Sequence, residues 1–436
     1  MIPGVPSTTT SDSNDLFTRG EEGSLKFLLY AQDGKGMGHI TRSLTIARHF
    51  LEVYRNSVAY IVSESPLVDE FSLPARCSYI KLPTHLAALP LPNTPEEDEA
   101  YNQHVSDYRA QILRKLALDL APDLVLMDHE PFGHKGEFRD GLYALKAKCP
   151  NTRFVLGLRD IMDDIGRINA KWEALGVYAA FENLFDGIVV YGLRNLFDVA
   201  EAYLIPESAQ LKLHYCGYVV REWKQASSEE VRLRYKLPLN GRLVVATVGG
   251  GRDGYFVLET AQAAFSRLRS KLANVCAVFV AGPFMSEEQR ALLLSRCPPG
   301  SAVLPVADNF QLIGAADAVI GMGGYNSVWE ALSRGRPLII VPRATYKREQ
   351  TIRAEMLASH GLARVVQPAD LTGENLADAL EWALRLNPVE VARKVREIVP
   401  AFNGASNLIS YLGRLMGEDL SYPTPREEIA LAKVVR

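Results

Sequence analysis

The stretch AADAVIGMGGYNSVWEALSRGRPLIIV, residues 315–341, decides the fold. Its apolar run at 318–321 predicts a short buried strand, and the glycines that follow predict a tight turn. A helix is expected from about Tyr325 to Arg334, and a second buried strand at 337–341. Strand, turn, helix and strand in this order are typical of a parallel α/β sheet.

The turn also predicts an anion site, because uncovered amides at a helix N-terminus carry partial positive charge. Asn326 or Ser327 is expected to cap this helix. Glu330 follows within about one helical turn, where its carboxylate can reach the hydroxyls of a sugar attached to the anion. The same pattern also fits an α/β protein that uses glycine only for the turn, so both interpretations stay open here.

The alternation of strands and helices extends over most of the chain. Short apolar runs that predict strands lie at 25–31, 58–62, 78–82, 123–128, 153–160, 187–192, 213–219, 243–248, 276–282, 302–306, 318–321, 337–341 and 363–366. Longer helices are expected at about 101–120, 172–185 and 388–416, the last with a break near 400–404. The pattern predicts an α/β protein with two Rossmann-like parallel-sheet domains that face a central cleft.

A polar, charged joint after residue 220 separates the two series of strands. The domains are predicted as a disordered tail at 1–24, an N-terminal acceptor-binding domain at 25–220, a C-terminal nucleotide-sugar-binding domain at 221–400, and a helix packing back toward the N-terminal domain, then a tail, at 401–436. Glycine loops follow strands at 34–39, 249–254 and 321–324, so all three are expected at the cleft.

Composition excludes several classes of protein. The 436 residues are 47% hydrophobic and carry a net charge of −3, which argues against a nucleic-acid-coating protein. Five cysteines form no CxxC pair, so neither a disulfide framework nor structural zinc is expected. The chain shows no secretory signal and no run of roughly 20 apolar residues for a membrane span. We expect a cytoplasmic monomer or homodimer.

These motifs together resemble GT-B glycosyltransferases, and glycosyltransferase family 28 most closely. The resemblance is carried by the Gly-x-Gly-His loop at 36–39, by GGYNSVWEAL at 323–332 and by GRPLIIVPR at 335–343. Family 28 includes the enzyme that adds N-acetylglucosamine to the lipid-linked peptidoglycan precursor. The resemblance implies a GT-B fold and a nucleotide-diphosphate-sugar donor, with no cofactor.

The resemblance also implies donor-binding residues. Glycine-rich loops and the helix start would hold the diphosphate, Glu330 the ribose, Glu349 and Gln350 the sugar hydroxyls, and the segment 306–310 the base. Arg221 lies in a joint that matches the family at only three of five positions. The full predicted donor set is Gly249, Gly250, Gly251, Arg221, Phe310, Gly323, Gly324, Tyr325, Asn326, Ser327, Glu330, Glu349 and Gln350.

Sugar transfer also needs a base for the acceptor hydroxyl. His39 ends the first glycine loop, and its imidazole titrates near neutrality. Several GT-B enzymes orient such a histidine with an aspartate after a later strand, which implies Asp128 as orienter or as the base itself. Predicted acceptor contacts are Gly36, Gly38, His129 and His134. Alternatively, His39 only caps its helix or binds phosphate, and Asp128 is a turn residue.

Other candidate residues favour structural roles. The sequence His129-Glu130-x-x-x-His134 lacks the helical spacing of a metal site, because Pro131 and Gly133 interrupt a helix. The carboxylates of Asp160, Asp163 and Asp164 are expected in a solvated loop or helix cap rather than in acid–base chemistry. The aromatic residues expected to pack in the core are Tyr101, Tyr108 and Trp172.

The sequence and the resemblance therefore predict an inverting, metal-independent glycosyltransferase. It would move a sugar from a uridine-diphosphate-linked donor to a hydroxyl of a soluble small-molecule or natural-product acceptor. One alternative is a nucleotide-sugar epimerase or hydrolase on the same fold. A second is a non-catalytic nucleotide-sugar-binding subunit. An NAD(P)-dependent enzyme is disfavoured, because GKGMGH only approaches Gly-x-Gly-x-x-Gly and the best ribose-binding acid after the second strand is Glu64.

Overall fold

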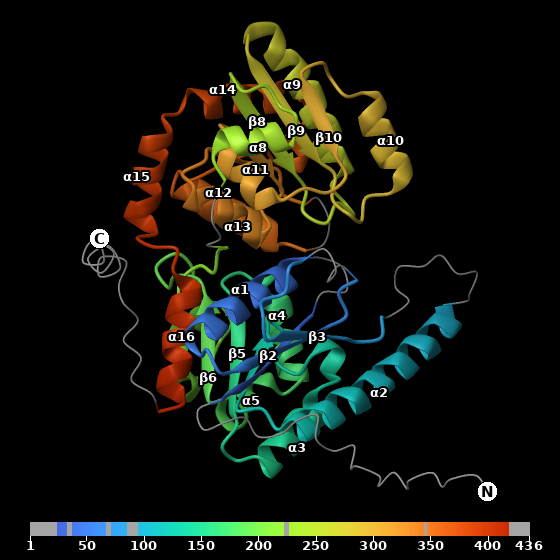
Figure 1. The fold of residues 1–436 in the computed structure, drawn as a ribbon, viewed down its shortest axis with the longest axis vertical. Coiled ribbons are helices and arrows are strands. Elements are labelled where there is room, and N and C mark those ends of the chain that lie inside the picture. The colour runs from blue at the N-terminus through green and yellow to red at the C-terminus, as the bar shows by residue number, and fades with distance from the viewer. Residues whose placement is uncertain are drawn as a thin grey trace, which may run out of the picture.

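The computed structural model describes residues 24–32, 37–66, 71–84, 95–221, 226–343 and 347–417. These residues form two lobes, each built on one parallel sheet with helices on both faces (Figure 1). The predicted α/β architecture with two Rossmann-like domains is confirmed.

The N-terminal domain contains a seven-stranded parallel sheet in the order β3-β2-β1-β4-β5-β6-β7. Its strands are β1 Lys26–Ala31, β2 Val58–Ser63, β3 Cys77–Lys81, β4 Leu124–Asp128, β5 Arg153–Arg159, β6 Gly187–Tyr191 and β7 Leu213–Tyr215. The central strands are apolar almost without interruption because helices cover both of their faces. Neighbouring β1 and β4 end side by side, with Ala31 opposite Asp128.

The helices of this domain are α1 Gly38–Val53, α2 Pro95–Leu120, the 3-10 turn η3 His134–Gly136, α3 Arg139–Lys148, α4 Ile165–Ala174, α5 Val177–Asn183, α6 Val199–Ala202 and α7 Glu207–Gln210. Two predicted helices need correction. The helix expected from 101 starts at Pro95, and proline is well tolerated in a first helical turn. The single helix expected at 172–185 is two helices, because Gly176 adopts a left-handed φ of 62° between them.

The C-terminal domain contains a six-stranded parallel sheet in the order β10-β9-β8-β11-β12-β13. Its strands are β8 Arg242–Thr247, β9 Val275–Val280, β10 Ser301–Leu304, β11 Ala318–Gly321, β12 Leu338–Ile340 and β13 Arg364–Val365. Its helices are α8 Ser228–Arg234, α9 Tyr255–Lys271, α10 Glu287–Ser295, α11 Asn309–Ala315, α12 Tyr325–Ser333, α13 Glu349–Ser359, the 3-10 turn η4 Pro368–Asp370, α14 Gly373–Arg385 and α15 Pro388–Ile398.

The last described helix, α16 Gly404–Leu415, lies against the N-terminal domain, beside α1 and β6 (Figure 1). The Asn407 side-chain amide donates to the Cys216 carbonyl at 2.9 Å. The Tyr411 ring stacks on His214 with centroids 4.5 Å apart. The chain therefore crosses between the lobes twice, and the predicted break near 400–404 separates α15 from α16.

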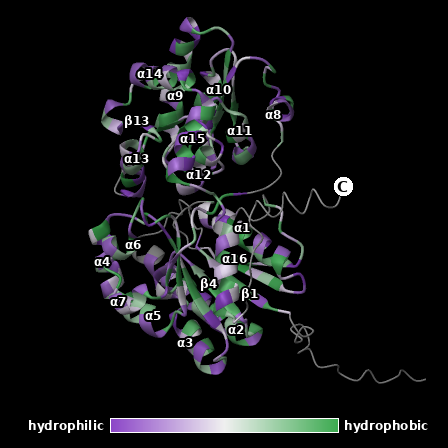
Figure 2. Cartoon of the chain, turned by 90° about the vertical axis from the view of Figure 1, so that its left-hand side faces the viewer, coloured by the Kyte–Doolittle hydropathy of each residue, from purple (hydrophilic) through white to green (hydrophobic). Residues whose placement is uncertain are grey.

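Hydrophobic residues concentrate on the strands, whereas the surrounding helices carry both polar and apolar surface (Figure 2). One buried cluster runs from the N-terminal sheet into the C-terminal domain, where Tyr218 stacks on Trp329 at a centroid distance of 3.3 Å. Among the described helices, none is long and apolar enough to cross a membrane.

Candidate active site

A histidine–aspartate pair lies where β1 and β4 end. Helix α1 starts just after β1 and carries His39 in its first turn, so the imidazole meets the carboxylate that ends β4. His39 Nδ1 lies 2.6 Å from Oδ2 of Asp128. The carboxylate is buried and the imidazole is partly exposed. The structure thus brings the two predicted catalytic residues together, and their roles stay predictions.

Arg42 is a third member of this cluster that the sequence analysis missed. It follows His39 by three residues on α1, so both side chains lie on one face of the helix. Its guanidinium donates to Oδ1 of Asp128 from Nε and Nη2, at 3.1 and 3.0 Å, and to Oδ2 from Nη2 at 2.8 Å. An arginine on the same face as a candidate base was the available sequence signal.

Burial and charge together set the protonation states of the cluster. Burial alone would raise the pKa of the Asp128 carboxyl, but Arg42 and His39 outweigh it and lower this pKa to about 2. Burial lowers the pKa of His39; Asp128 opposes this effect, while Arg42 and Arg159 add to it. At neutral pH the aspartate is therefore ionised and the imidazole neutral. With its Nδ1–H donated to Asp128, the ring presents Nε2 as a proton acceptor.

The predicted donor turn leads into α12, opposite this cluster. Gly323 has a φ of 83°, and Gly324 is the N-cap residue of the helix. The expectation that Asn326 or Ser327 caps α12 is wrong, since among the described residues no side chain caps its N-terminus. Instead, the Ser327 hydroxyl donates to the Gly324 carbonyl at 3.2 Å. The first amides of α12 thus lack a side-chain cap and suit an anion.

Two side chains of α12 reach into the N-terminal domain. Asn326 donates its amide N–H to the Gly38 carbonyl at 3.2 Å, beside His39. The Tyr325 hydroxyl donates to the Tyr191 carbonyl at 3.0 Å, and its ring is buried. The donor turn and the histidine loop are therefore in direct contact.

Glu330, the predicted ribose-binding acid, is buried on α12 and pairs with Arg221 at 2.7 Å. The Arg221 guanidinium also lies over the Phe310 ring, 5.1 Å from its centroid. Phe310 is 0% exposed, so its side chain offers no free face to a nucleobase in this conformation. The exposed residue of the predicted base-binding segment is Val306.

The predicted sugar-binding pair begins α13. Glu349 forms an ion pair with Arg159 of the other domain at 2.9 Å. Gln350 is buried, and its side-chain oxygen accepts the Arg343 backbone N–H at 3.0 Å. Arg159 ends β5, and its Nη2 lies 3.4 Å from Nε2 of His129. Glu349 therefore faces the histidine side of the cleft.

The loop after β8 holds the remaining predicted donor glycines, Gly249, Gly250 and Gly251. Gly251 has a φ of 88°, and a Cβ there would lie 2.0 Å from the Ala281 carbonyl oxygen, so this glycine is needed for close backbone packing. Gly249 also has a positive φ, but a Cβ there would meet nothing within 4 Å. Among the described residues, Gly249 thus has open space where a side chain would lie, whereas Gly251 does not.

The predicted acceptor contacts divide into two groups. Gly38 and His129 lie at the histidine–aspartate pair, with the His129 ring centroid 5.2 Å from that of His39. His134 lies further out, where the Gln32 amide donates to its Nδ1 at 2.5 Å. Gly36 lies outside the described residues.

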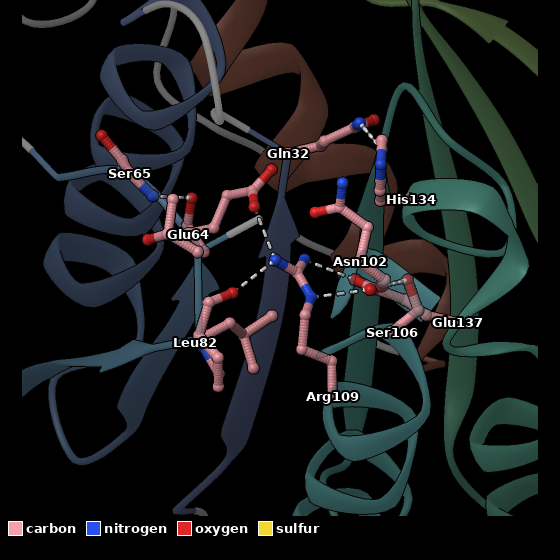
Figure 3. Close-up of polar contacts among 12 residues, drawn as sticks. Gln32, Glu64, Ser65, Leu82, Asn102, Ser106, Arg109, His134 and Glu137 are labelled. Carbon is pink, nitrogen blue, oxygen red and sulfur yellow. Dashed lines mark hydrogen bonds and ion pairs between the residues drawn. The ribbon is translucent and has the colours of Figure 1, made fainter. Parts of the chain in front are cut away.

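Beneath these contacts lies a buried charge cluster (Figure 3). Arg109 of α2 reaches between two glutamates, with Glu137 at 2.6 Å and Glu64 at 2.6 Å. Glu137 also accepts the Tyr30 hydroxyl at 2.7 Å, and that hydroxyl accepts the His134 backbone N–H at 2.9 Å. The cluster anchors the loop between β4 and α3.

The remaining candidates have structural contacts. Asp164 caps α4 by accepting the Arg167 N–H, as the helix-cap interpretation predicted, whereas Asp160 is fully buried and pairs with Arg353. Trp172 packs in the core as predicted, at 2% exposure. For Tyr101 and Tyr108 the core prediction is wrong, since they are 45% and 54% exposed on α2. Among the described residues, no three His, Cys, Asp or Glu side chains form a possible metal site.

Comparison with families and relatives agrees with this architecture. Residues 247–402 match the family described as glycosyltransferase family 28 C-terminal domain. An uncharacterised glycosyltransferase of Methanopyrus kandleri is 27% identical over 44% of this chain and 56% of that protein. One from Methanosarcina acetivorans is 24% identical over 89% of this chain and 98% of its own length.

An N-acetylglucosamine transferase of Lactiplantibacillus plantarum, acting on a pyrophosphoryl-undecaprenol substrate, is 31% identical over 31% of this chain and 38% of its own. The chain thus spans about half or less of the Methanopyrus and Lactiplantibacillus proteins.

Solved glycosyltransferases share the fold. The calicheamicin glycosyltransferase CalG4 has a TM-score of 0.60 and 18% identity over 90% of this chain and 98% of its own. A UDP-glucosyltransferase from Polygonum tinctorium has a TM-score of 0.64 and 14% identity over 92% of this chain and all of its own. The predicted GT-B fold and the predicted resemblance to glycosyltransferases, family 28 among them, are confirmed.

Proposed function

We propose that this protein transfers a sugar from a nucleotide-diphosphate donor, a uridine-linked one, to a hydroxyl of a soluble small-molecule acceptor. The observation that carries the proposal is the contact between the histidine–aspartate pair and the uncapped start of α12. One side supplies a base and the other an anion site, and they meet where the two domains join. The family 28 match covers the domain of the anion site.

In the proposed reaction, His39 Nε2 takes the proton of the acceptor hydroxyl as that oxygen attacks the anomeric carbon. The bond between this carbon and the phosphate oxygen breaks, and the diphosphate leaves with the electron pair. Asp128 stabilises the imidazolium that forms. Both carboxylate oxygens of Asp128 are held by Arg42, and Oδ2 also by His39, so Asp128 is not placed to act as a nucleophile. A single displacement inverts the anomeric centre.

The amides at the start of α12, together with the helix dipole, would stabilise the leaving diphosphate without a metal ion. Glu330 would accept hydrogen bonds from the ribose hydroxyls, and Glu349 from the hydroxyls of the transferred sugar. Each carboxylate is now paired with an arginine, Arg221 and Arg159 respectively. Donor binding would therefore exchange these ion pairs for hydroxyl contacts, and it would release two arginines beside the diphosphate.

The uridine assignment is supported by the names of relatives. The Lactiplantibacillus relative is named as a UDP-N-acetylglucosamine-dependent transferase. Structural neighbours were solved with UDP or with a fluorinated UDP-glucose. These ligands belong to those proteins, and for this chain they select the donors to test first.

The first experiment is a thermal-shift panel of UDP-, GDP- and dTDP-sugars, repeated with EDTA. We expect a UDP-sugar to raise the melting temperature, with or without EDTA, and Glu330→Ala to abolish the shift. Glu288→Ala, at an exposed position on α10, is the matched control. If no nucleotide sugar shifts the melting temperature, the donor half of the proposal is wrong.

The second experiment separates donor binding from catalysis. His39→Ala should keep the donor-induced thermal shift and lose turnover by roughly 100-fold or more, since a general base contributes about 10²–10⁴-fold. Donor incubated without an acceptor is the control for other chemistry. Release of free sugar at the full catalytic rate would favour a hydrolase, and formation of a different nucleotide sugar would favour an epimerase.

An NAD(P) enzyme is not supported by the structure. Glu64, the residue best placed by sequence to bind a dinucleotide ribose, is buried, and its carboxylate pairs with Arg109 at 2.6 Å (Figure 3).

A further inference from the structure

The proposed mechanism does not say what Arg42, a buried cation of the site, contributes to catalysis. Arg42 is 2% exposed, and its guanidinium is turned toward Asp128. A buried arginine beside a catalytic pair is costly to desolvate, so its contacts should explain its presence. Its strongest contacts are to Asp128, the residue that orients the proposed base.

The two oxygens of Asp128 are bound differently. Oδ1 accepts from Nε and Nη2 of Arg42, at 3.1 and 3.0 Å. Oδ2 lies 2.8 Å from Nη2 of Arg42 and 2.6 Å from Nδ1 of His39. A planar guanidinium that holds both oxygens fixes the plane of the carboxylate. The carboxylate therefore cannot rotate away from the imidazole without breaking the arginine contacts.

The contacts of Nδ1 decide the tautomer of His39. Nη2 of Arg42 lies 3.0 Å from Nδ1 of His39, and this nitrogen faces both a donor and a carboxylate. We assign the Nδ1 proton to the 2.6 Å contact with Asp128, because an arginine N–H can be satisfied by Asp128 at similar distances. This assignment leaves Nε2 unprotonated, so Nε2 is the ring nitrogen that can accept a proton.

Aromatic rings hold the guanidinium in place from both domains. Arg42 lies over the Tyr191 ring at 4.8 Å and over the Tyr325 ring at 5.3 Å. Tyr191 ends β6 of the N-terminal domain, and Tyr325 is the first residue of α12. The Tyr325 hydroxyl is itself fixed, since it donates to the Tyr191 carbonyl and accepts the Val219 N–H at 3.1 Å. The donor helix therefore covers Arg42.

We propose that Arg42 is a positioning residue for the reaction: it fixes the Asp128 carboxylate against Nδ1 of His39 and so keeps Nε2 as the proton acceptor. This inference rests on the proposed function, in which His39 is the base. Because Tyr325 lies over the guanidinium, the arrangement also depends on the docking of α12 against the N-terminal domain.

The charges around His39 give this geometry an electrostatic consequence. The groups that face it are Asp128 on β4, Arg42 on its own helix, His129 after β4, and Arg159 at the end of β5. Within the described part of the chain, Asp128 is the group among these that favours the imidazolium, and Arg42 offsets its charge. Removing the Arg42 charge should therefore raise the pKa of His39 and protonate the base nearer to neutral pH.

The test uses four variants of the full chain. Arg42→Met removes the charge and keeps the aliphatic stem. Arg42→Lys keeps a charge but not the planar two-oxygen contact. Arg55→Met is the control, since Arg55 is exposed just beyond α1. The titration of His39 is followed by NMR of histidine labelled with carbon-13 and nitrogen-15 in the ligand-free protein, with His39→Ala for assignment. Turnover is measured with UDP-N-acetylglucosamine and a panel of hydroxyl-bearing small molecules as acceptors.

The proposal expects the His39 titration midpoint to rise in Arg42→Met and to stay near the wild-type value in Arg42→Lys. It expects turnover at neutral pH to fall at least about tenfold in both, because small displacements of reacting groups cost up to about 10²-fold. Part of the loss in Arg42→Met should be recovered at higher pH. In the wild type, nitrogen-15 shifts should show the proton on Nδ1.

An unchanged His39 midpoint in Arg42→Met, or wild-type turnover in Arg42→Lys, would overturn the proposal. If Arg42→Met does not fold, two other results test the proposal. Wild-type turnover in Arg42→Lys, or a proton on Nε2 of His39 in the wild type, would overturn it. If the wild type does not cleave any nucleotide sugar, the proposed function fails, whereas the NMR titration still tests the effect of Arg42 on His39.

Discussion

Replacing Arg353 by methionine should destabilise the protein strongly, because this arginine joins the two domains from a fully buried position. Its exposure is 0%, and it lies on α13 of the C-terminal domain. The guanidinium donates to the carbonyl of Gly323 at 2.8 Å, to that of Ile161 at 3.2 Å, and to Oδ1 of Asp160 at 3.4 Å. It thus ties the donor turn to the loop after β5.

The expected cost follows from what the substitution leaves behind. Arg353→Met leaves the Asp160 carboxylate buried without its cation, and breaking a buried pair in this way costs about 3–5 kcal/mol. Two carbonyls also lose a donor, so the upper half of that range is expected. Adding Asp160→Asn removes the unpaired charge and should recover more than about 1 kcal/mol.

Urea unfolding measures this effect, with Arg348→Met as the control. Arg348 also reaches across the domain junction, to Asp164 at 3.4 Å, but its side chain is 57% exposed, so its loss should cost under about 1 kcal/mol. A cost below about 1 kcal/mol for Arg353→Met, or no recovery in the double variant, would refute the reasoning.

The pH dependence of stability gives a further check on Arg353. Burial raises the pKa of Asp160, and Arg353 opposes that effect. Without Arg353 this pKa should rise further. A carboxyl with a folded-state pKa above its unfolded value holds its proton more tightly when folded, so Arg353→Met should regain stability as the pH falls from neutrality through that pKa.

Three other predictions concern single side chains. The lowering of the Asp128 pKa from 3.8 to about 2 corresponds to about 2.5 kcal/mol of stability. This stability is present above about pH 4 and is lost toward pH 2. Urea unfolding should therefore show that the difference in stability between wild type and Asp128→Asn becomes smaller on acidification. Gly323→Ala forces a left-handed φ of 83° on alanine and brings its Cβ within 3.1 Å of Ile340. Calorimetry should show about 1–3 kcal/mol of destabilisation and weaker UDP-sugar binding. Gly166→Ala, at a position without a left-handed φ, is the control and should show neither effect. Arg109→Met leaves two buried glutamates without a cation and should lower the free energy of unfolding in urea by about 3–5 kcal/mol. A smaller loss of stability for Arg109→Lys would show that charge carries most of the effect.

Features set by local pattern were predictable from the sequence. Continuous apolar runs located the strands, because parallel strands are buried on both faces. The contact of His39 with Asp128 also followed from pattern, since both residues come directly after strands whose carboxyl ends meet at one edge of the sheet. The break between α15 and α16 was marked by Pro400 and Gly404.

Features set by distant contacts were not predictable in this way. Nothing local to Glu349 indicates that Arg159, 190 positions earlier, neutralises it across the cleft. The side chain of Asn326 suits an N-cap, yet it donates to the Gly38 carbonyl, because docking of the other domain supplies that acceptor. Arg42 reads as a surface residue of an amphipathic helix until the fold places Asp128 beneath it.

These distant contacts converge on the junction between the donor turn and the histidine loop. Gly323 is held by Arg353, which also binds the N-terminal domain, and Asn326 holds the backbone beside His39. The carboxylates expected to bind the donor are paired with arginines, one from each domain. A donor that replaces these pairs must act on the same contacts that place α12 against the N-terminal domain. Donor binding and alignment of the base are therefore coupled. One arrangement keeps the arginine–carboxylate pairs and the other has exchanged them for donor contacts. A donor shifts the equilibrium between them only by the difference in its affinity for the two.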